Sequence, residues 1–446
     1  MFLQIHSIRH LAKVALLLTA FVVTEMRFTQ ADPKPCDPFP PAPPEEAAQK
    51  YLGLAEKQFQ ATAYEAAVAS YDCAVQFDPD NPATYYARGL SLYYYQRYED
   101  SIKDFSKAID LGMTELERPF YMRGYVYFEL QEYTQALQDF SKAIDVGMTK
   151  LDRSFYMRGY VYFELEAYTQ AIQDFTHAID INDQYASAYL MRARGYEMIG
   201  DNVLALDDYS TAIDYAAGQA LVSAYVFRGD LYRRTGNSAG ALADFNAAVQ
   251  LDGSNPINFV YRGMVYDSME MYSFSINDYT KAIALDPTYR DAYYFRGLSY
   301  SDMGSYEAAL RDFETALAYG LTTRETYYSI GLAHLELEQH TEAINSLSAA
   351  IEEDPSYKEA YYVRGLAYAE QWMVRQAVAD YLMAIGLDAN YPAPYKGLGA
   401  LYYGLGWYRA ALRSYQIYVN LVGADAAQDV LDRIHEIEIT LKYPRR

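Results

Sequence analysis

The chain has 446 residues, of which 51% are hydrophobic, and a formal net charge of −22 at pH 7. This apolar content can bury a large core, whereas so acidic a surface repels phosphate backbones and anionic lipid, which argues against nucleic-acid and peripheral membrane binding. Tyrosine is the outlying residue type, with 49 copies against 19 Phe and 2 Trp.

Residues 1–31 have the composition of a secretory signal peptide. A basic start that includes Arg9 and Lys13 leads into a ten-residue apolar run at 14–23, and small residues precede a cleavage site after residue 31. The run is short for a bilayer-spanning helix. The sequence therefore predicts a secreted or periplasmic, cell-envelope protein with no integral membrane span after signal removal. The alternative is an uncleaved anchor or a buried helix.

Residues 32–47 are rich in proline and predict an extended, semi-rigid linker. They contain Cys36, and the only other cysteine of the chain is Cys73. If the chain is exported, a disulfide between the two is chemically permitted and would fix the linker to the segment that follows it. The alternative is two unpaired thiols, because the sequence does not supply the geometry that decides between them.

From residue 48 to about residue 421 the chain repeats itself with a period close to 34 residues. Two copies, 112–145 and 147–180, are identical at 26 of 34 positions, which indicates a recent duplication. In each unit, two apolar stripes with helical spacing flank a short polar turn, so each unit is predicted to be an antiparallel helix pair. An anchor residue marks the same place in every unit: Ala55, Gly89, Gly124, Gly159, Ala193, Gly229, Gly263, Gly297, Gly331, Gly365 and Gly399.

With the anchor numbered as position 8, the units carry small residues at positions 8, 20 and 27 and aromatic residues at positions 4, 11, 17 and 24. One unit shows the whole pattern, in Tyr293, Gly297, Tyr300, Tyr306, Ala309, Phe313 and Ala316. This pattern resembles the tetratricopeptide repeat. The resemblance implies an all-α, right-handed α-α superhelical solenoid of about eleven helix pairs, with residues 422–446 as a C-terminal capping helix and tail.

Position 7 is arginine in eight units, and position 23 is aspartate in the same eight. The three other units combine leucine or isoleucine at position 7 with serine at position 23. We expect a structural ion pair between the two helices of each of the eight units, because the planar guanidinium can bond a carboxylate at two points. The alternative is that both residues face water and descend together from one ancestral repeat. The predicted pairs are Arg88–Asp104, Arg123–Asp139, Arg158–Asp174, Arg192–Asp208, Arg228–Asp244, Arg262–Asp278, Arg296–Asp312 and Arg364–Asp380.

Tyrosines at positions 4, 11, 17 and 24 belong to the repeat framework, and they account for 28 of the 49. In the resembled family, positions 2, 5, 9, 12 and 13 of the first helix line a concave groove. Repeats 2–4 place nine aromatic residues there, which predicts an aromatic binding surface. The alternatives are burial against neighbouring helices and drift in a duplicated segment. The nine are Tyr86, Tyr93, Tyr94, Tyr121, Tyr125, Phe128, Tyr156, Tyr160 and Phe163. Repeats 8–10 return to tyrosine and leucine at the same positions.

Catalytic and metal-binding motifs are missing from the sequence. The six histidines show no metal-ligand spacing, and phosphate-cradling or nucleophile motifs are absent. Position 9 is never asparagine, so the resemblance does not extend to the clamp with which some family members bind acidic peptide ends. We therefore predict no cofactor, no metal and no enzymatic activity. The expected function is an exported scaffold that binds a peptide or partner protein in its groove, with carbohydrate binding by groove tyrosines as the alternative; the sequence does not indicate the oligomeric state.

Overall fold

The computed structural model describes Cys36, residues 43–147 and residues 151–442. The predicted signal peptide at 1–31 and the predicted linker up to residue 42, apart from Cys36, lie outside this part. The chain divides into two compact units, one ending at Leu231 and one beginning at Tyr232, and each is described by itself. Within the described residues, all regular secondary structure is helical, and none of the helices combines the length and the apolar character needed to cross a membrane.

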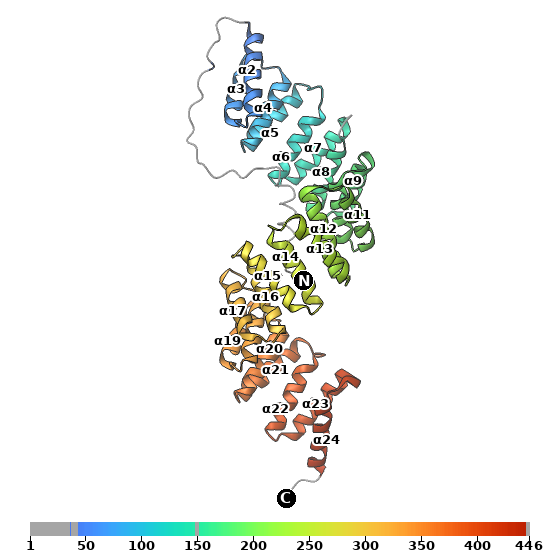
Figure 1. Ribbon diagram of the computed structural model, residues 1–446, viewed down its shortest axis with the longest axis vertical. Coiled ribbons are helices and arrows are strands. Elements are labelled where there is room, and N and C mark those ends of the chain that lie inside the picture. The colour runs from blue at the N-terminus through green and yellow to red at the C-terminus, as the bar shows by residue number, and fades with distance from the viewer. Residues whose placement is uncertain (1–35, 37–42, 148–150, 443–446) are drawn as a thin grey trace. The chain divides into compact units, whose positions relative to one another are not determined.

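The first unit contains five helix pairs and most of helix α12, whose last residues belong to the second unit (Figure 1). Its helices are α2 (Pro44–Gln60), α3 (Tyr64–Phe77), α4 (Pro82–Tyr94), α5 (Tyr98–Asp110), α6 (Glu117–Glu129), α7 (Tyr133–Val146), α8 (Leu151–Glu164), α9 (Tyr168–Ile181), α10 (Ala186–Met198), α11 (Asn202–Tyr215) and α12 (Gly218–Arg234).

The second unit begins with the last residues of α12 and contains α13, five further helix pairs and a last helix. Its helices are α13 (Ser238–Leu251), α14 (Pro256–Ser268), α15 (Tyr272–Leu285), α16 (Arg290–Asp302), α17 (Tyr306–Ala318), α18 (Arg324–Glu336), α19 (His340–Glu353), α20 (Lys358–Glu370), α21 (Val374–Leu387), α22 (Pro392–Gly404), α23 (Tyr408–Val422), the 3₁₀ turn η1 (Gly423–Asp425) and α24 (Gln428–Lys442).

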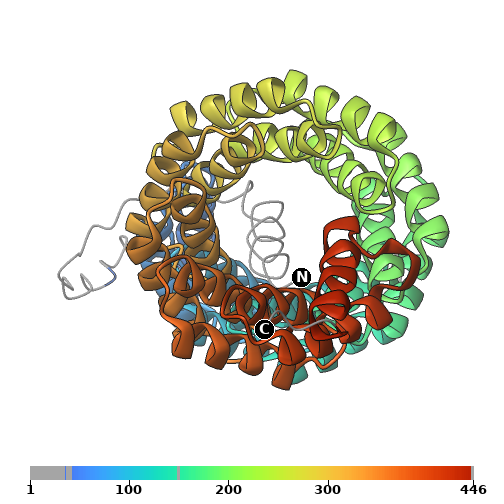
Figure 2. The same ribbon diagram turned by 90° about the horizontal axis from the view of Figure 1, so that it is seen from below.

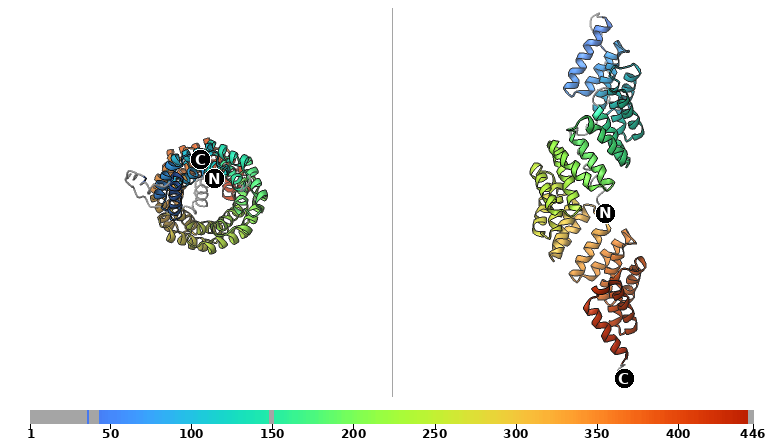
Figure 3. Two further views of the ribbon diagram at one scale, coloured as in Figure 1. Left: turned by 90° about the horizontal axis from the view of Figure 1, so that it is seen from above. Right: turned by 90° about the vertical axis from the view of Figure 1, so that its right-hand side faces the viewer.

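Within each unit the first and second helices of successive repeats form two layers. Figure 2 shows the layers end-on in the yellow and orange part of the second unit, and Figure 3 shows the stacked pairs of each unit from the side. Successive first helices such as α4, α6 and α8 contact one another, whereas successive second helices do not make contacts of that extent. The first helices therefore line the inner side of each unit.

The anchor glycine allows the two helices of a pair to approach closely. A Cβ atom added at Gly263 would lie 2.6 Å from Cε1 of Tyr279, the position-24 ring of the same repeat. The position-24 side chain and the small residue at position 20 are buried in every repeat, as Phe313 and Ala309 illustrate. The small-residue and aromatic pattern of the sequence is thus the contact surface between paired helices.

The turn within each repeat is closed by one residue with positive φ at position 15. These residues are Thr62, Gln96, Gln131, Glu166, Gly200, Gly236, Glu270, Gly304, Glu338, Trp372 and Gly406. The next residue donates its backbone N–H to the carbonyl five residues earlier, as Arg97 does to Leu92 at 2.8 Å. This is the bond pattern of a helix end that favours glycine, yet seven of the eleven repeats use another residue.

Replacing Trp372 by glycine should therefore raise the free energy of unfolding of its repeat, by about 0.5–1 kcal/mol, because a side chain at φ +58° is strained there. Its indole is 72% exposed and loses little packing. Thermal unfolding followed by circular dichroism measures the change. The control is Trp407→Gly, where φ is −84° and the indole stacks on Tyr402, and which should destabilise. Equal losses in both variants would contradict the argument.

The N-terminal end of the array differs in detail from the predicted boundary. Helix α2 begins at Pro44, four residues before the predicted start of the repeats, because Pro at the first helical position and Glu45 and Glu46 in the first turn favour a helix start. At the other end, helix α24 covers α23 and buries Val430 and Ile437 against Tyr415. Cys36 and Cys73 form a disulfide that joins the N-terminal segment to helix α3.

Candidate functional site

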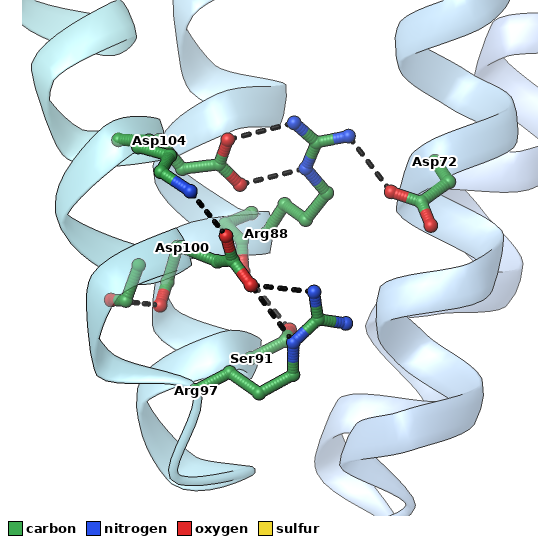
Figure 4. A network of polar contacts seen from close by, with 10 residues as sticks. Asp72, Arg88, Ser91, Arg97, Asp100 and Asp104 are labelled. Carbon is green, nitrogen blue, oxygen red and sulfur yellow. Dashed lines mark hydrogen bonds and ion pairs between the residues drawn. The ribbon is translucent and has the colours of Figure 1, made fainter. Parts of the chain in front are cut away.

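The position-7 arginine makes a forked contact with the position-23 aspartate of its own repeat. In repeat 2, Nε and Nη2 of Arg88 each lie 2.7 Å from an oxygen of Asp104 (Figure 4). The remaining nitrogen, Nη1, donates to Asp72 in the preceding repeat at 2.8 Å. One guanidinium therefore connects three helices, α3, α4 and α5, with a hydrogen bond from each of its three nitrogens.

The same fork occurs in the seven predicted pairs that lie within one unit, each with 2.7 Å between Nε and the carboxylate. The arginine side chains are 14–20% exposed and the aspartate side chains 2–8%. The forked hydrogen bond to Asp174 raises the pKa of Arg158. The seven are Arg88–Asp104, Arg123–Asp139, Arg158–Asp174, Arg192–Asp208, Arg262–Asp278, Arg296–Asp312 and Arg364–Asp380. Of the eighth predicted pair, Asp244 is buried and Arg228 donates to Ser210 at 3.0 Å.

The third contact of each arginine reaches position 25 of the preceding repeat, which always supplies a small polar acceptor. The acceptors are Asp72, Ser106, Ser141, Thr176, Ser210, Asn246, Thr280 and Ser348. The guanidinium also lies 5.3–5.9 Å from the centroid of the position-4 ring one turn earlier on its own helix. It is thus held by charge, by hydrogen bonds and by a ring face.

Sequence reasoning missed the position-25 partner, although the sequence carries a signal for it. Repeats 9 and 11, which lack the arginine, follow repeats whose position 25 is Glu314 or Leu382. Repeat 1, which also lacks it, has no preceding repeat to contact. The arginine is present wherever a small acceptor precedes it, so its role is to join neighbouring repeats as well as the two helices of one repeat.

The nine groove aromatics of repeats 2–4 lie on the inner face of α4, α6 and α8, but they are not equally accessible. Tyr94 is 49% exposed, six others are half-buried, and Tyr160 and Phe163 are only 4% and 9% exposed. The predicted continuous exposed surface is therefore wrong at Tyr160 and Phe163. There the first of the alternatives holds, because adjacent first helices lie close enough to cover these rings.

Ring contacts connect the three helices. Tyr93 of α4 meets Tyr125 of α6 edge-on with centroids 5.8 Å apart, and Phe128 of α6 meets Tyr160 of α8 at 5.5 Å. Arg194 of α10 closes the row, with its guanidinium 4.9 Å from the centroid of Phe163. These contacts join the aromatic side chains of α4, α6 and α8 into one row.

Burial raises the pKa of several phenol groups of this row. It raises the pKa of Tyr121 to about 12, and burial followed by the neighbouring Tyr125 raises the pKa of Tyr93. At neutral pH the row is thus uncharged apart from carboxylates and guanidiniums at its margins. Such a surface offers apolar contact area together with hydroxyl donors.

Other candidate sites are weak. One open pocket of about 680 Å³ is lined by Arg324, Tyr357, Lys358 and Asp388, among others. Its cations are engaged, since Arg324 pairs with Asp354, and Nζ of Lys358 lies 2.6 Å from a carboxylate oxygen of Asp388. Within residues 36, 43–147 and 151–442, histidine, cysteine and carboxylate side chains do not gather in groups of three or more that suit a metal ion.

Three family models match the chain. One described as "TPR repeat" matches residues 59–94 and 331–371. Two described as "Tetratricopeptide repeat" match residues 86–148 with 294–344, and residues 152–185 with 222–255. Together these matches cover just over half of the sequence. No match was found among the curated proteins.

Several solved structures are similar to the chain at low sequence identity. A tetratricopeptide repeat protein from Parabacteroides merdae is 18% identical, with 57% of this chain and 99% of that chain covered and a TM-score of 0.46. Yeast Tom70 is 14% identical over 89% and 96% of the two chains, with a TM-score of 0.38. YrrB, described as "a TPR protein with an unusual peptide-binding site", is 22% identical over 44% and 97%, with a TM-score of 0.37.

Proposed function

The chain is a tetratricopeptide repeat protein, and from this premise we propose that it is an exported, non-catalytic scaffold that binds a partner protein or peptide along the first helices of repeats 2–4. Arrays of this family typically serve as scaffolds for protein–protein interaction. The observation that supports this location is the connected row of half-buried aromatic side chains across α4, α6 and α8.

The row suits a protein partner because it combines half-buried aromatic side chains and tyrosine hydroxyl groups with one exposed ring. Tyr94 stands at one end, and the hydroxyls of Tyr93 and Tyr125 lie close to Glu129. Aromatic residues with polar tips contribute a large share of the affinity in protein interfaces at small cost in conformational entropy. Stacking against a sugar needs an open ring face, and of the nine rings only that of Tyr94 is exposed. Carbohydrate binding at this site is therefore not favoured by the structure.

Export is part of the proposal. The basic start, the ten-residue apolar run and the small residues before position 32 support it, and so does the disulfide between Cys36 and Cys73. Fractionation of cells that make the protein should place it outside the cytoplasm, with an N-terminus at Asp32 by mass spectrometry. A cytoplasmic location would contradict the proposed export. It would not bear on the proposed binding site in repeats 2–4.

Photo-crosslinking tests the binding site. A benzophenone amino acid at Tyr94 should give one discrete protein adduct in cells, while the same group at Tyr215, a 46% exposed tyrosine of α11, should not. Excess unlabelled protein should compete for the adduct, and Tyr125→Ala protein should compete at least about tenfold less well, as expected for an interface anchor. Identical adducts at both positions, or an adduct removed by glycosidases, would overturn the proposal.

A further inference from the structure

The first helices of repeats 8–10 carry a second pattern, which differs in chemistry from the aromatic row. In α16, α18 and α20 an acid at position 2 and another at position 13 enclose a tyrosine at position 5 and a leucine at position 9. The four rows are Asp291, Glu325 and Glu359; Tyr294, Tyr328 and Tyr362; Leu298, Leu332 and Leu366; and Asp302, Glu336 and Glu370. We call these twelve residues the acidic groove.

The apolar rows of the acidic groove are half-buried and remain partly accessible. Tyr328 and Leu332 pack against the core of repeats 9 and 10, and each keeps part of its surface in solvent. Since the first helices line the inner side of the second unit and contact one another in sequence, α16 to α18 and α18 to α20, these side chains form a continuous floor.

The outer acidic row makes no ion pair with a lysine, arginine or histidine of the described residues. Its three members, Asp302, Glu336 and Glu370, are exposed to solvent. Burial and then the nearby Asp267 carboxylate raise the pKa of Asp302, so like charges face one another at this end. A cation placed along this row would relieve that repulsion.

The inner acidic row is only partly neutralised by its own neighbours. Nε of Arg324 lies 2.8 Å from Glu325, but the corresponding distances are 3.8 Å from Arg290 to Asp291 and 3.9 Å from Lys358 to Glu359. Burial followed by the Glu359 carboxylate raises the pKa of Tyr328. This carboxylate from the next repeat therefore lies beside the tyrosine of the floor.

No lysine or arginine occupies any of the groove positions 2, 5, 9, 12 and 13 in repeats 8–10, whereas repeats 2–4 carry Arg118 and Arg153 there, balanced by Glu129 and Glu164. We infer that the acidic groove binds a cationic amphipathic segment of a partner protein, whose apolar side chains cover the tyrosine and leucine rows while its lysines or arginines face the two acidic rows. Charge complementarity identifies this occupant, because an acidic or neutral segment would bury the carboxylates without compensation.

This inference is independent of the binding site in repeats 2–4, so each can fail alone. The test measures binding of a blocked 15-residue peptide, five Lys-Leu-Lys units, to the full chain by fluorescence anisotropy. The groove variant Asp302→Asn, Glu336→Gln, Glu370→Gln should bind about tenfold more weakly. The matched control is Glu307→Gln, Glu314→Gln, Glu342→Gln, which removes three exposed carboxylates from the second helices α17 and α19 of repeats 8 and 9 and should bind like the wild type.

Two further peptides separate the contribution of the apolar side chains from that of the positive charges. A Lys-Ser-Lys peptide should bind far more weakly than Lys-Leu-Lys, and a Glu-Leu-Glu peptide should not bind. Equal losses in the groove and control variants, equal binding of the serine and leucine peptides, or no binding at all would overturn the inference. A measurement on the wild type needs no variant: a photo-reactive leucine in the peptide should label α16, α18 or α20 by mass spectrometry, and labelling elsewhere would equally overturn it.

Discussion

Replacing Arg158 by leucine should lower the free energy of unfolding of its repeat by about 3–5 kcal/mol, because a buried carboxylate is left without its partner. The Asp174 side chain is only 6% exposed, and both of its oxygens accept from Arg158. Leucine also loses the hydrogen bond to Ser141, which joins α8 to the preceding repeat. Hydrogen exchange of α8 and α9 amides measures the change locally, as a repeat array need not unfold in one step.

The double variant Arg158→Leu, Asp174→Ser is the control for this prediction. It reproduces the combination that repeats 1 and 11 carry, Leu54 with Ser70 and Leu398 with Ser414. With the charge removed from both positions, most of the lost stability should return. If the single and double variants have the same melting temperature and the same local protection, the forked pair does not contribute as argued.

Removing the disulfide, by Cys36→Ser with Cys73→Ser, should lower the stability of the first repeat by about 2–4 kcal/mol. The bond closes a segment of 37 residues that contains all of α2, so its loss increases the freedom of the unfolded segment. Hydrogen exchange should show faster exchange in α2 and α3, with little change in α6 and beyond, because each repeat contacts only its neighbours.

Reduction of the wild-type disulfide is the control for the disulfide prediction, since it should reproduce the exchange pattern of the double serine variant. Thiol titration under denaturing, non-reducing conditions should find no free cysteine in the wild type. Two free thiols, or unchanged protection of α2 and α3 in the variant, would contradict the prediction.

The repeat architecture was predictable from the sequence because the residues that hold a helix pair together all lie within one repeat. The anchor glycine, the position-20 alanine and the position-24 ring all act between the two helices of one pair, so their spacing recurs with the period and is visible in the chain. The Arg158–Asp174 type of pair was predictable for the same reason, since both partners lie in one unit.

Contacts between neighbouring repeats were harder to predict from the sequence. The third partner of each arginine is Ser, Thr, Asn or Asp, which share only an acceptor atom, so position 25 shows no single conserved letter along the chain. The exposure of Tyr160 and Phe163 depends on how closely α6, α8 and α10 approach one another, and periodicity within a unit does not set that distance. The binding site in repeats 2–4 therefore remains a prediction.

The arginine contacts also explain how this chain tolerates growth by copying. When a unit such as 112–145 is duplicated in tandem, the copied arginine finds its aspartate within the copy and its hydroxyl acceptor in the original, as Arg158 does with Asp174 and Ser141. At either junction, whatever the number of copies, each position-7 arginine keeps its position-23 aspartate. Lineages could thus lengthen or shorten the array through unequal recombination between near-identical segments, changing its reach while every new junction folds as the old ones did.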